Sequence, residues 1–511
     1  MRRFIFSLAL VCSYAFKSAH SFGGAMEGLE DAMDIQREQL ERLGDFLGPM
    51  NIPSSAPAKR QSSITFSNPA AEQFFVDGTK IPLVNFDAGP SWSGLMPISG
   101  DPNETRKLFF WFWPTNNVSN TKDLLFWTNG PGCSSLEGFL QENGPISWSW
   151  GQAEPTPNPW SWTNLSHVLW VEQPVGTGFS QGTPNITNDD QLAAELMGFF
   201  EQFLEVFQEL KGNDFWLSGE SSDDDRTVRR VLYVPYIANW IYEHPGLDLN
   251  LKGIWIADPS LSYGVVQQEI PALRFARANQ NLFPFNSSFW DELQAISDKC
   301  GYTDYLDDFV TYPPAGQLPL PVATNGTFTV TQACRIHSPI QRAVGVLNPV
   351  FDVYRVSDTW PNLWSVLGFP RSTQEFVQDA IHAPHIVWNS CADRSVYLPG
   401  GDRSIPSTLS VLPNVIEKSE RVIIVHGLAD FILVAEGTRI AIQNMTWNGA
   451  QGFQTPIEPE TFSVKNMGVY GNEHTERGLT YVEFYFSEFV PWASFSTLAY
   501  LLGKQDSPSS G

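Results

Sequence analysis

The sequence has little positive charge. Its 511 residues include 31 lysines and arginines against 55 aspartates and glutamates, which gives a formal net charge of −24 at pH 7. Nucleic-acid binding needs clustered basic side chains, and the one basic cluster of note consists of Arg226, Arg229 and Arg230. Nucleic acid is therefore not an expected partner. An acidic surface suits a protein that works at low pH, where protonation lowers its self-repulsion.

Long hydrophobic runs are also scarce. Residues 4–16 form a mostly apolar run after two arginines, and small residues follow at Ala19 and Ser21. This pattern is typical of a signal peptide, which we expect at residues 1–21. The run is too short for a typical membrane-spanning helix and no second candidate follows, so no membrane span is expected after signal removal. The chain also lacks internal repeats, which favours one large domain.

Cysteines are few, and their number is informative. Cys12 lies in the expected signal peptide, and the remaining even set of Cys133, Cys300, Cys334 and Cys391 fits an oxidising compartment, with three possible pairings. Sequons indicate the same secretory route, to the vacuole or the cell exterior. The asparagines two residues before Ser or Thr, all expected to be glycosylated, are Asn103, Asn117, Asn164, Asn185, Asn286, Asn325 and Asn444.

The segment 22–65 precedes the expected core. Apolar residues recur at helical spacing from Met26 to Leu47, and Pro53 ends the pattern. The dibasic pair Lys59-Arg60 follows in a polar linker. Two interpretations stay open: a removable pro-segment, or an ordinary solvated helix at the N-terminus.

Short apolar runs bounded by polar or turn residues predict buried strands, and an apolar face at helical spacing predicts a long helix at residues 191–210. Residues 261–399 are irregular and rich in proline and aromatics, which indicates a cap inserted between core segments 66–260 and 400–505. The expected strands are 108–113, 123–127, 168–171, 215–217, 251–257, 421–425 and 479–486.

Gly219-Glu220-Ser221 follows one of these strands, as the nucleophile does on the sharp strand-to-helix turn of an α/β hydrolase. Gly219 would give that turn room for strained backbone angles. A Gly-x-Ser sequence occurs often by chance, so the glycine-rich turn at residues 129–135, Asn-Gly-Pro-Gly-Cys-Ser-Ser, is the stronger signal.

Together, the segments 129–135, 164–180, 233–238 and 426–430 closely resemble the serine carboxypeptidase family, in its fungal secreted or vacuolar form. The resemblance extends, with gaps, over about residues 66–502. It implies an α/β-hydrolase fold: a mostly parallel central sheet, helices on both faces and an inserted cap. It also implies release of C-terminal residues from peptides or proteins through an acyl-enzyme, without a cofactor or metal.

By this resemblance, Ser221 is the nucleophile and Asp430 is the carboxylate that orients a histidine base. Asp430 follows the strand at 421–425, where catalytic groups gather in open α/β sheets. The alternative is an aspartate that caps a helix beginning near Phe431. The family pattern also implies that Cys133 pairs with Cys391, which leaves Cys300 with Cys334 by elimination.

Other positions match the substrate-binding parts of the family. Asn129, Gly130 and Glu220 match residues that hold the terminal carboxylate of the substrate, and a buried Glu220 with a raised pKa would donate a hydrogen bond to it. The alternative is a surface glutamate. The backbone amides of Gly130 and Ser222 would stabilise the oxyanion, a role in which one donor typically contributes about 3 kcal/mol.

The chain departs from the family pattern at three catalytic motifs. The turn has one glycine before Pro131 where the family usually has two, and the residue missing there would displace an oxyanion donor by about 3 Å. Residues 221 and 233 are separated by seven more residues than in the family, three of them acidic. Glu488 stands where the family has its histidine, and His474, the one histidine after Asp430, is expected at the opposite end of the sheet.

Without that histidine, the chain as written should be nearly inactive, because a serine hydroxyl at its ordinary pKa is a poor nucleophile. Mistaken exon boundaries or a degenerate family member would each explain the pattern. Two further functions stay open: a non-catalytic protein that binds peptide termini, and an esterase or acyltransferase with the same machinery.

Overall fold

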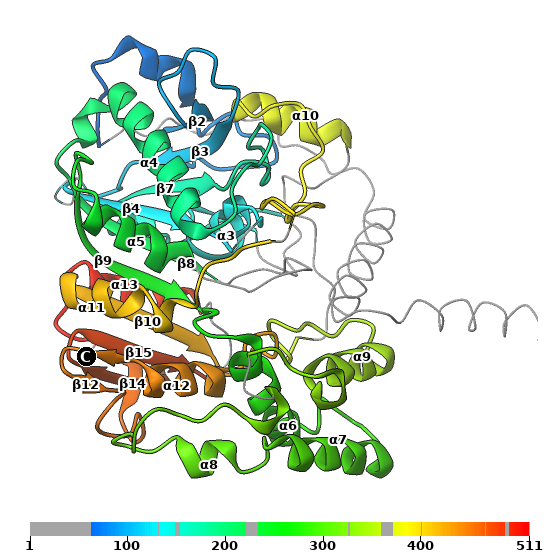
Figure 1. Cartoon of the computed structure of the whole chain (residues 1–511). Helices are drawn as coiled ribbons and strands as arrows, with labels where there is room; N and C mark the ends of the chain where they lie inside the picture. The colour runs from blue at the N-terminus through cyan, green and yellow to red at the C-terminus, as the bar shows by residue number, and fades with distance from the viewer. Residues whose placement is uncertain are drawn as a thin grey trace, which may run out of the picture.

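The computed structural model describes residues 63–509, except 118, 120, 131, 149–153, 221–232, 325–327, 359–370, 400, 466 and 486–489. The expected signal peptide and the segment up to residue 62 lie outside the described residues. The described part contains an eleven-stranded sheet in the order β1-β2-β3-β7-β4-β8-β9-β10-β15-β14-β13 (Figure 1). Its strands are β1 (Phe75–Val76), β2 (Ser91–Pro97), β3 (Lys107–Trp113), β4 (Asp123–Thr128), β7 (His167–Glu172), β8 (Asp214–Glu220), β9 (Asn250–Ala257), β10 (Arg421–Gly427), β13 (Thr461–Val464), β14 (Gly468–Glu476) and β15 (Leu479–Phe484).

The central six strands, from β7 to β15, run parallel, and the outer strands are antiparallel. Each strand expected from the sequence is present, but β15 ends at Phe484, two residues earlier than expected. Two short ribbons lie apart from the sheet: β5 (Ile146–Ser147) with β6 (Thr156–Pro157), and β11 (Thr446–Trp447) with β12 (Ala450–Gln451).

The strands alternate between two hydrophobic cores, because successive side chains point to opposite faces of a sheet. On β3, Phe110 and Phe112 belong to one core, while Trp111 and Trp113 belong to the other. The continuous apolar run of this strand therefore reflects burial on both faces.

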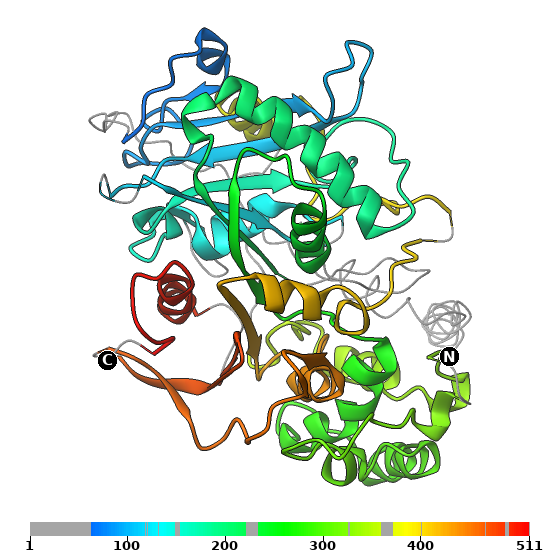
Figure 2. The same cartoon turned by 60° about the vertical axis from the view of Figure 1, so that its left-hand side comes forward.

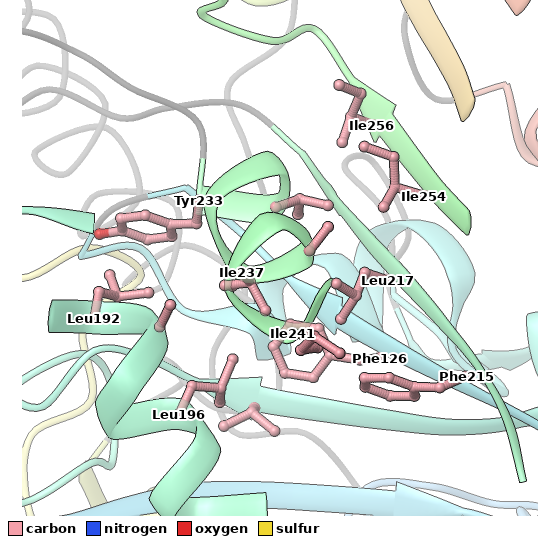
Figure 3. Packing of buried hydrophobic residues seen from close by; sticks show 14 of the residues in the cluster. Phe126, Leu192, Leu196, Phe215, Leu217, Tyr233, Ile237, Ile241, Ile254 and Ile256 are labelled. Carbon is pink, nitrogen blue, oxygen red and sulfur yellow. The ribbon is translucent and has the colours of Figure 1, made fainter. Parts of the chain in front are cut away.

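Helices cover both faces. On the first face lie α4 (Asp189–Val206), α5 (Tyr233–Glu243), α11 (Leu412–Lys418) and α12 (Ala435–Asn444), and on the second lie α3 (Ser135–Gly138) and α13 (Pro491–Leu501). Figure 3 shows Ile237 and Ile241 of α5 packed between α4 and the strands β4, β8 and β9. The helix expected at 191–210 begins at Asp189, because the Asn188 side chain caps it, and α4 ends at Val206.

Residues 261–399 divide into two parts. The helices α6 (Ile270–Ala278), α7 (Ser287–Cys300), α8 (Tyr305–Phe309) and α9 (His337–Leu347) form a helical region with its own hydrophobic core beside the sheet (Figures 1 and 2). In contrast, α10 (Arg371–Ala380) and the residues after it return to the sheet, where Ile381 and Trp388 join the second core. None of the described helices has the length and apolar character needed to cross a bilayer.

Candidate active site

Four neighbouring parallel strands bring polar side chains to the same edge of the sheet. Asn129 follows β4, Glu220 ends β8, Asp258 follows β9 and Asp430 follows β10. Carboxyl ends of parallel strands are where ligands bind in open α/β sheets. The nucleophile predicted at Ser221 directly follows Glu220 in sequence, but Ser221 and Ser222 lie outside the described residues.

The Asn129 side chain is fixed from two sides. Trp127 Nε1 donates a hydrogen bond to Asn129 Oδ1 at 2.8 Å, and Asn129 Nδ2 donates to Glu220 Oε2 at 3.2 Å. The buried Gly130 lies next to it, and its carbonyl accepts a hydrogen bond from Cys133 N at 2.9 Å. The three residues predicted to hold a terminal carboxylate, Asn129, Gly130 and Glu220, thus lie side by side.

Glu220 is surrounded by other carboxyl groups. Burial raises its pKa, and hydrogen bonds with Glu142 and Asn129 oppose that shift. Burial also raises the pKa of Glu137 to about 7, to which the charge of Glu220 adds, while a hydrogen bond from Gln141 lowers it. The sequence did predict a raised pKa for Glu220. It gave no reason to single out Glu137 or Glu142, although both follow the glycine turn closely.

The expectation that Gly219 allows strained backbone angles at the turn is wrong, because its φ angle is not positive. A Cβ at this position would lie 2.6 Å from Thr128 O and 2.8 Å from Val234 Cγ2. Glycine is therefore required because β4, β8 and α5 approach one another closely there, and not because the turn strains the backbone.

Asp430 lies buried in the loop after β10. Its Oδ1 accepts hydrogen bonds from Ile432 N at 2.6 Å and Leu433 N at 3.1 Å, an arrangement suited to a charged carboxylate. No helix begins near Phe431; α12 begins at Ala435, and Val434 occupies its N-cap position. The alternative role of Asp430 as a helix cap is therefore wrong.

Asp258 is a site residue that sequence reasoning missed. Its Oδ1 accepts a hydrogen bond from Gly427 N at 2.9 Å and lies 3.1 Å from His426 Nε2, which is 3.9 Å from Asp430 Oδ2. The signal was present, because Asp258 directly follows β9, the neighbour of β10. Asp258 also has a positive φ of 39°, which is uncommon for a residue other than glycine.

His426 is the histidine within 4 Å of Asp430 among the described residues, but it is poorly placed to act as a base. Its Nε2 lies 2.5 Å from Leu433 O and its Nδ1 lies 3.0 Å from Thr438 Oγ1, and burial lowers its pKa to about 4. Asp258, His426 and Asp430 also bring possible metal ligands within 4.8 Å of one another. Since the histidine nitrogens already have protein partners, we assign these groups to a hydrogen-bond network and not to a metal centre.

Comparison with known proteins identifies the family of this chain. The serine carboxypeptidase family model matches residues 82–284 and 372–488. The chain is 41% identical over 490 residues to a probable serine carboxypeptidase of Arthroderma benhamiae, covering 88% of this chain and 90% of that protein. This chain belongs to the serine carboxypeptidase family.

Two further similarities extend this result. Serine-type carboxypeptidase F of Aspergillus niger is 38% identical over 471 residues, covering 83% of this chain and 86% of that protein. The crystal structure of KEX1(Δ)p, a prohormone-processing carboxypeptidase from Saccharomyces cerevisiae, has a TM-score of 0.64 at 20% identity and covers 86% of this chain and 99% of its own. The similarity to this crystal structure shows that the chain has the α/β-hydrolase fold.

Within this serine carboxypeptidase, His474 lies on the edge strand β14. It pairs with Tyr481 of β15, whereas Gly471 pairs with Phe484 at the carboxyl end. Its ring nitrogens lie 3.1 Å from Glu460 Oε2 and 2.9 Å from Glu476 Oε1. These partners indicate a structural role. Glu488, which the sequence analysis aligns with the family's histidine, lies outside the described residues.

The cross-links and sequons are consistent with the secretory pathway. The structure contains both disulfides, Cys133–Cys391 and Cys300–Cys334, which fit an oxidising compartment. The sequons remain predictions, and Asn325 lies outside the described residues. Four of the asparagines are exposed (Asn103, Asn117, Asn185 and Asn286), and two are half-buried (Asn164 and Asn444).

Proposed function

We propose that this chain acts on the C-terminal residues of peptides at acidic pH, with Ser221 as the nucleophile that forms an acyl-enzyme. Asp430 orients the base, and the backbone amides of Gly130 and Ser222 bind the oxyanion. The compartment is the vacuole or the cell exterior. The observation that carries this proposal is the hydrogen bond from Asn129 to Glu220, immediately before Ser221.

This pair explains the choice of substrate. A terminal carboxylate is repelled by a second carboxylate unless the latter is protonated, and burial raises the pKa of Glu220. A protonated Glu220 can donate a hydrogen bond, and the Asn129 amide can donate another. Both donors would favour a free C-terminus over a lipid or an internal peptide bond, and the need for a protonated Glu220 is the reason to propose an acidic working range.

Turnover by the chain as written should be slow. The described residues place no histidine with a free ring nitrogen at Asp430, since both nitrogens of His426 are engaged. This observation favours a second candidate function, a non-catalytic family member that binds peptide C-termini at Asn129 and Glu220.

One assay separates the candidates. Purified protein is incubated at acidic pH with a blocked dipeptide and, separately, with a fluorophosphonate that labels reactive serines. We expect weak labelling that Ser221→Ala abolishes, and weak dipeptide turnover. Both should rise when the family's Gly-His pair is restored in a Ser487→Gly/Glu488→His variant.

The other outcomes are equally informative. Binding of the dipeptide without labelling or turnover in either protein would favour the non-catalytic candidate. Cleavage of ester acyl donors in preference to peptides would favour an esterase. Unchanged affinity for a dipeptide that ends in an amide would contradict recognition of a C-terminal carboxylate. Sequencing of the transcript would show whether the altered motifs belong to the expressed protein.

A further inference from the structure

A third carboxyl group belongs to the neighbourhood of Asn129 and Glu220. Glu137 lies in α3, the short helix that follows the glycine turn. This helix is pressed against Asn129: a Cβ on the next residue, Gly138, would lie 2.8 Å from Asn129 Oδ1 and 2.5 Å from Trp127 Nε1. Because of this close contact, the position of α3 relative to Asn129 is fixed.

The two oxygens of Glu137 have different surroundings. Gln141 Nε2 donates a hydrogen bond to Oε1. Oε2 is buried and has no hydrogen-bond partner among the residues that the structure describes. An oxygen in this state is costly unless it is protonated or meets a ligand.

We propose that Glu137 is a specificity-determining residue of the carboxylate site: its neutral form donates a hydrogen bond that helps to hold a peptide's terminal carboxylate, and its ionised form repels that carboxylate. This inference rests on the function proposed above. It adds a second protonated carboxyl group, after Glu220, to the recognition of the C-terminus and makes binding depend on pH near neutrality.

The charges around Glu137 support this role. The negative charge of Glu220, at the end of β8, raises the pKa of Glu137, and Glu142, in the helical turn Phe139–Asn143, is hydrogen-bonded to Glu220. The buried Glu172 of β7 accepts hydrogen bonds from Ser134 and Trp388 instead. Among the described residues, no salt bridge to Glu137 occurs.

The sign of the pH effect follows. Burial raises the pKa of Glu137 from 4.5 to about 7, so the group is neutral at acidic pH and ionises as the pH passes about 7. Affinity for an anionic C-terminus is therefore full at pH 5 and falls between pH 6 and 8. For a ligand without a terminal charge, protonation of Glu137 at low pH should not increase the affinity.

The experiment measures binding, so it does not require catalysis. The affinities of the full-length protein for N-acetylphenylalanine and for its C-terminal amide are measured by calorimetry from pH 5 to 8, in the wild type and in Glu137→Gln. Glutamine is neutral at every pH, is similar in shape and can still accept the hydrogen bond from Gln141. We expect the wild type to lose about tenfold more affinity for the acid over this range than Glu137→Gln loses.

Two variants serve as controls. Glu201→Gln, on the exposed side of α4, should behave as the wild type. Glu137→Asp keeps a carboxyl group and should keep the pH dependence at lower affinity, which a merely structural role would not predict. Thermal unfolding at pH 5 establishes that each variant is folded.

The outcomes distinguish the inference from the function on which it rests. If the acid binds better than the amide at pH 5 and the wild-type and Glu137→Gln curves are parallel, the role of Glu137 is refuted and the carboxylate site stands. If the acid and the amide bind equally at pH 5, the carboxylate site itself is refuted, and the role of Glu137 with it.

Discussion

Carboxyl groups are buried at both ends of the proposed site, but their surroundings differ. At the Asn129 end, the charge of Glu220 adds to the raised pKa of Glu137, and side-chain amides provide hydrogen bonds to both groups. At the Asp430 end, backbone N–H groups donate to Asp430 and Asp258. Side-chain amides can rotate to suit a neutral or a charged partner, whereas fixed N–H groups require an acceptor. Burial alone therefore does not set the role of a carboxyl group; the type of donor around it does.

The largest effect is expected when the disulfide at the Asn129 end is removed. The Cys133–Cys391 disulfide joins the glycine turn to a segment 258 residues away, and Cys300–Cys334 closes a separation of 34 residues in the helical region. Replacing Cys133 and Cys391 with alanine should lower the free energy of unfolding by about 5 kcal/mol, against about 4 kcal/mol for the other pair, because the longer loop has more entropy to lose. Denaturant unfolding measures both.

The same pair of variants separates stability from function. Only loss of Cys133–Cys391 should also weaken binding of N-acetylphenylalanine, because only that disulfide anchors the turn beside Asn129. Equal losses of binding in the two variants would show that the turn does not depend on its cross-link.

A second prediction concerns the pH dependence of stability at the Asn129 end. The pKa of Glu137 rises on folding from 4.5 to about 7, so the folded state holds its proton more tightly than the unfolded state does. Its stabilising contribution is complete below pH 4.5 and is lost as the pH rises through about 7, a change of roughly 3 kcal/mol. Urea unfolding from pH 4 to 8 should show this fall in the free energy of unfolding with rising pH in the wild type and a smaller fall in Glu137→Gln. An identical pH dependence in the two proteins would contradict the raised pKa of Glu137.

At the Asp430 end, the prediction concerns the loss of a hydrogen-bond acceptor and not a change of protonation state. Asp430→Ala leaves the N–H groups of Ile432 and Leu433 without their acceptor, whereas Asp430→Asn keeps an oxygen in place. The alanine variant should therefore be less stable than the asparagine variant by about 2 kcal/mol at neutral pH. Equal stabilities in chemical unfolding would mean that these hydrogen bonds are dispensable.

The smallest effect is expected for Trp127→Phe. This change removes the donor to Asn129 Oδ1 while an aromatic ring remains in the core. The protein should lose about 1 kcal/mol of stability. Because the Asn129 amide would no longer be oriented, affinity for a free C-terminus should fall while affinity for the amide-ended ligand stays constant. A parallel fall for both ligands would point to general damage.

Much of the fold could be predicted from the sequence. The apolar run at 108–113 indicated a strand buried on both faces, and β3 is such a strand. Boundaries were less predictable: α4 begins at Asp189 because the Asn188 side chain accepts a hydrogen bond from Gln191 N. Residues 261–399 divide because Val377 of α10 and the later Ile381 and Trp388 pack into the second core of the sheet. Composition alone does not reveal this packing.

The site was predictable where a motif marked it. Asn129, Gly130, Glu220 and Asp430 were predicted because each lies at or shortly after the end of a strand within a recognisable pattern. Asp258 was missed because it stands alone in sequence, although the rule about carboxyl ends of strands applied to it as well. Glu137 has no motif of its own, and its raised pKa arises from burial and from a charge that lies 83 positions further along the chain.

The sequence by itself determined the order of strands and helices, the family, and the identity of the groups at the ends of β4, β8 and β10, because each depends on neighbours within a few positions. The tertiary structure decided which carboxyl groups carry a proton and which accept backbone hydrogen bonds. Protonation depends on burial and on the distances between groups, and only folding brings residues as distant as Asn129 and Glu220, or Asp258 and Gly427, within reach of one another.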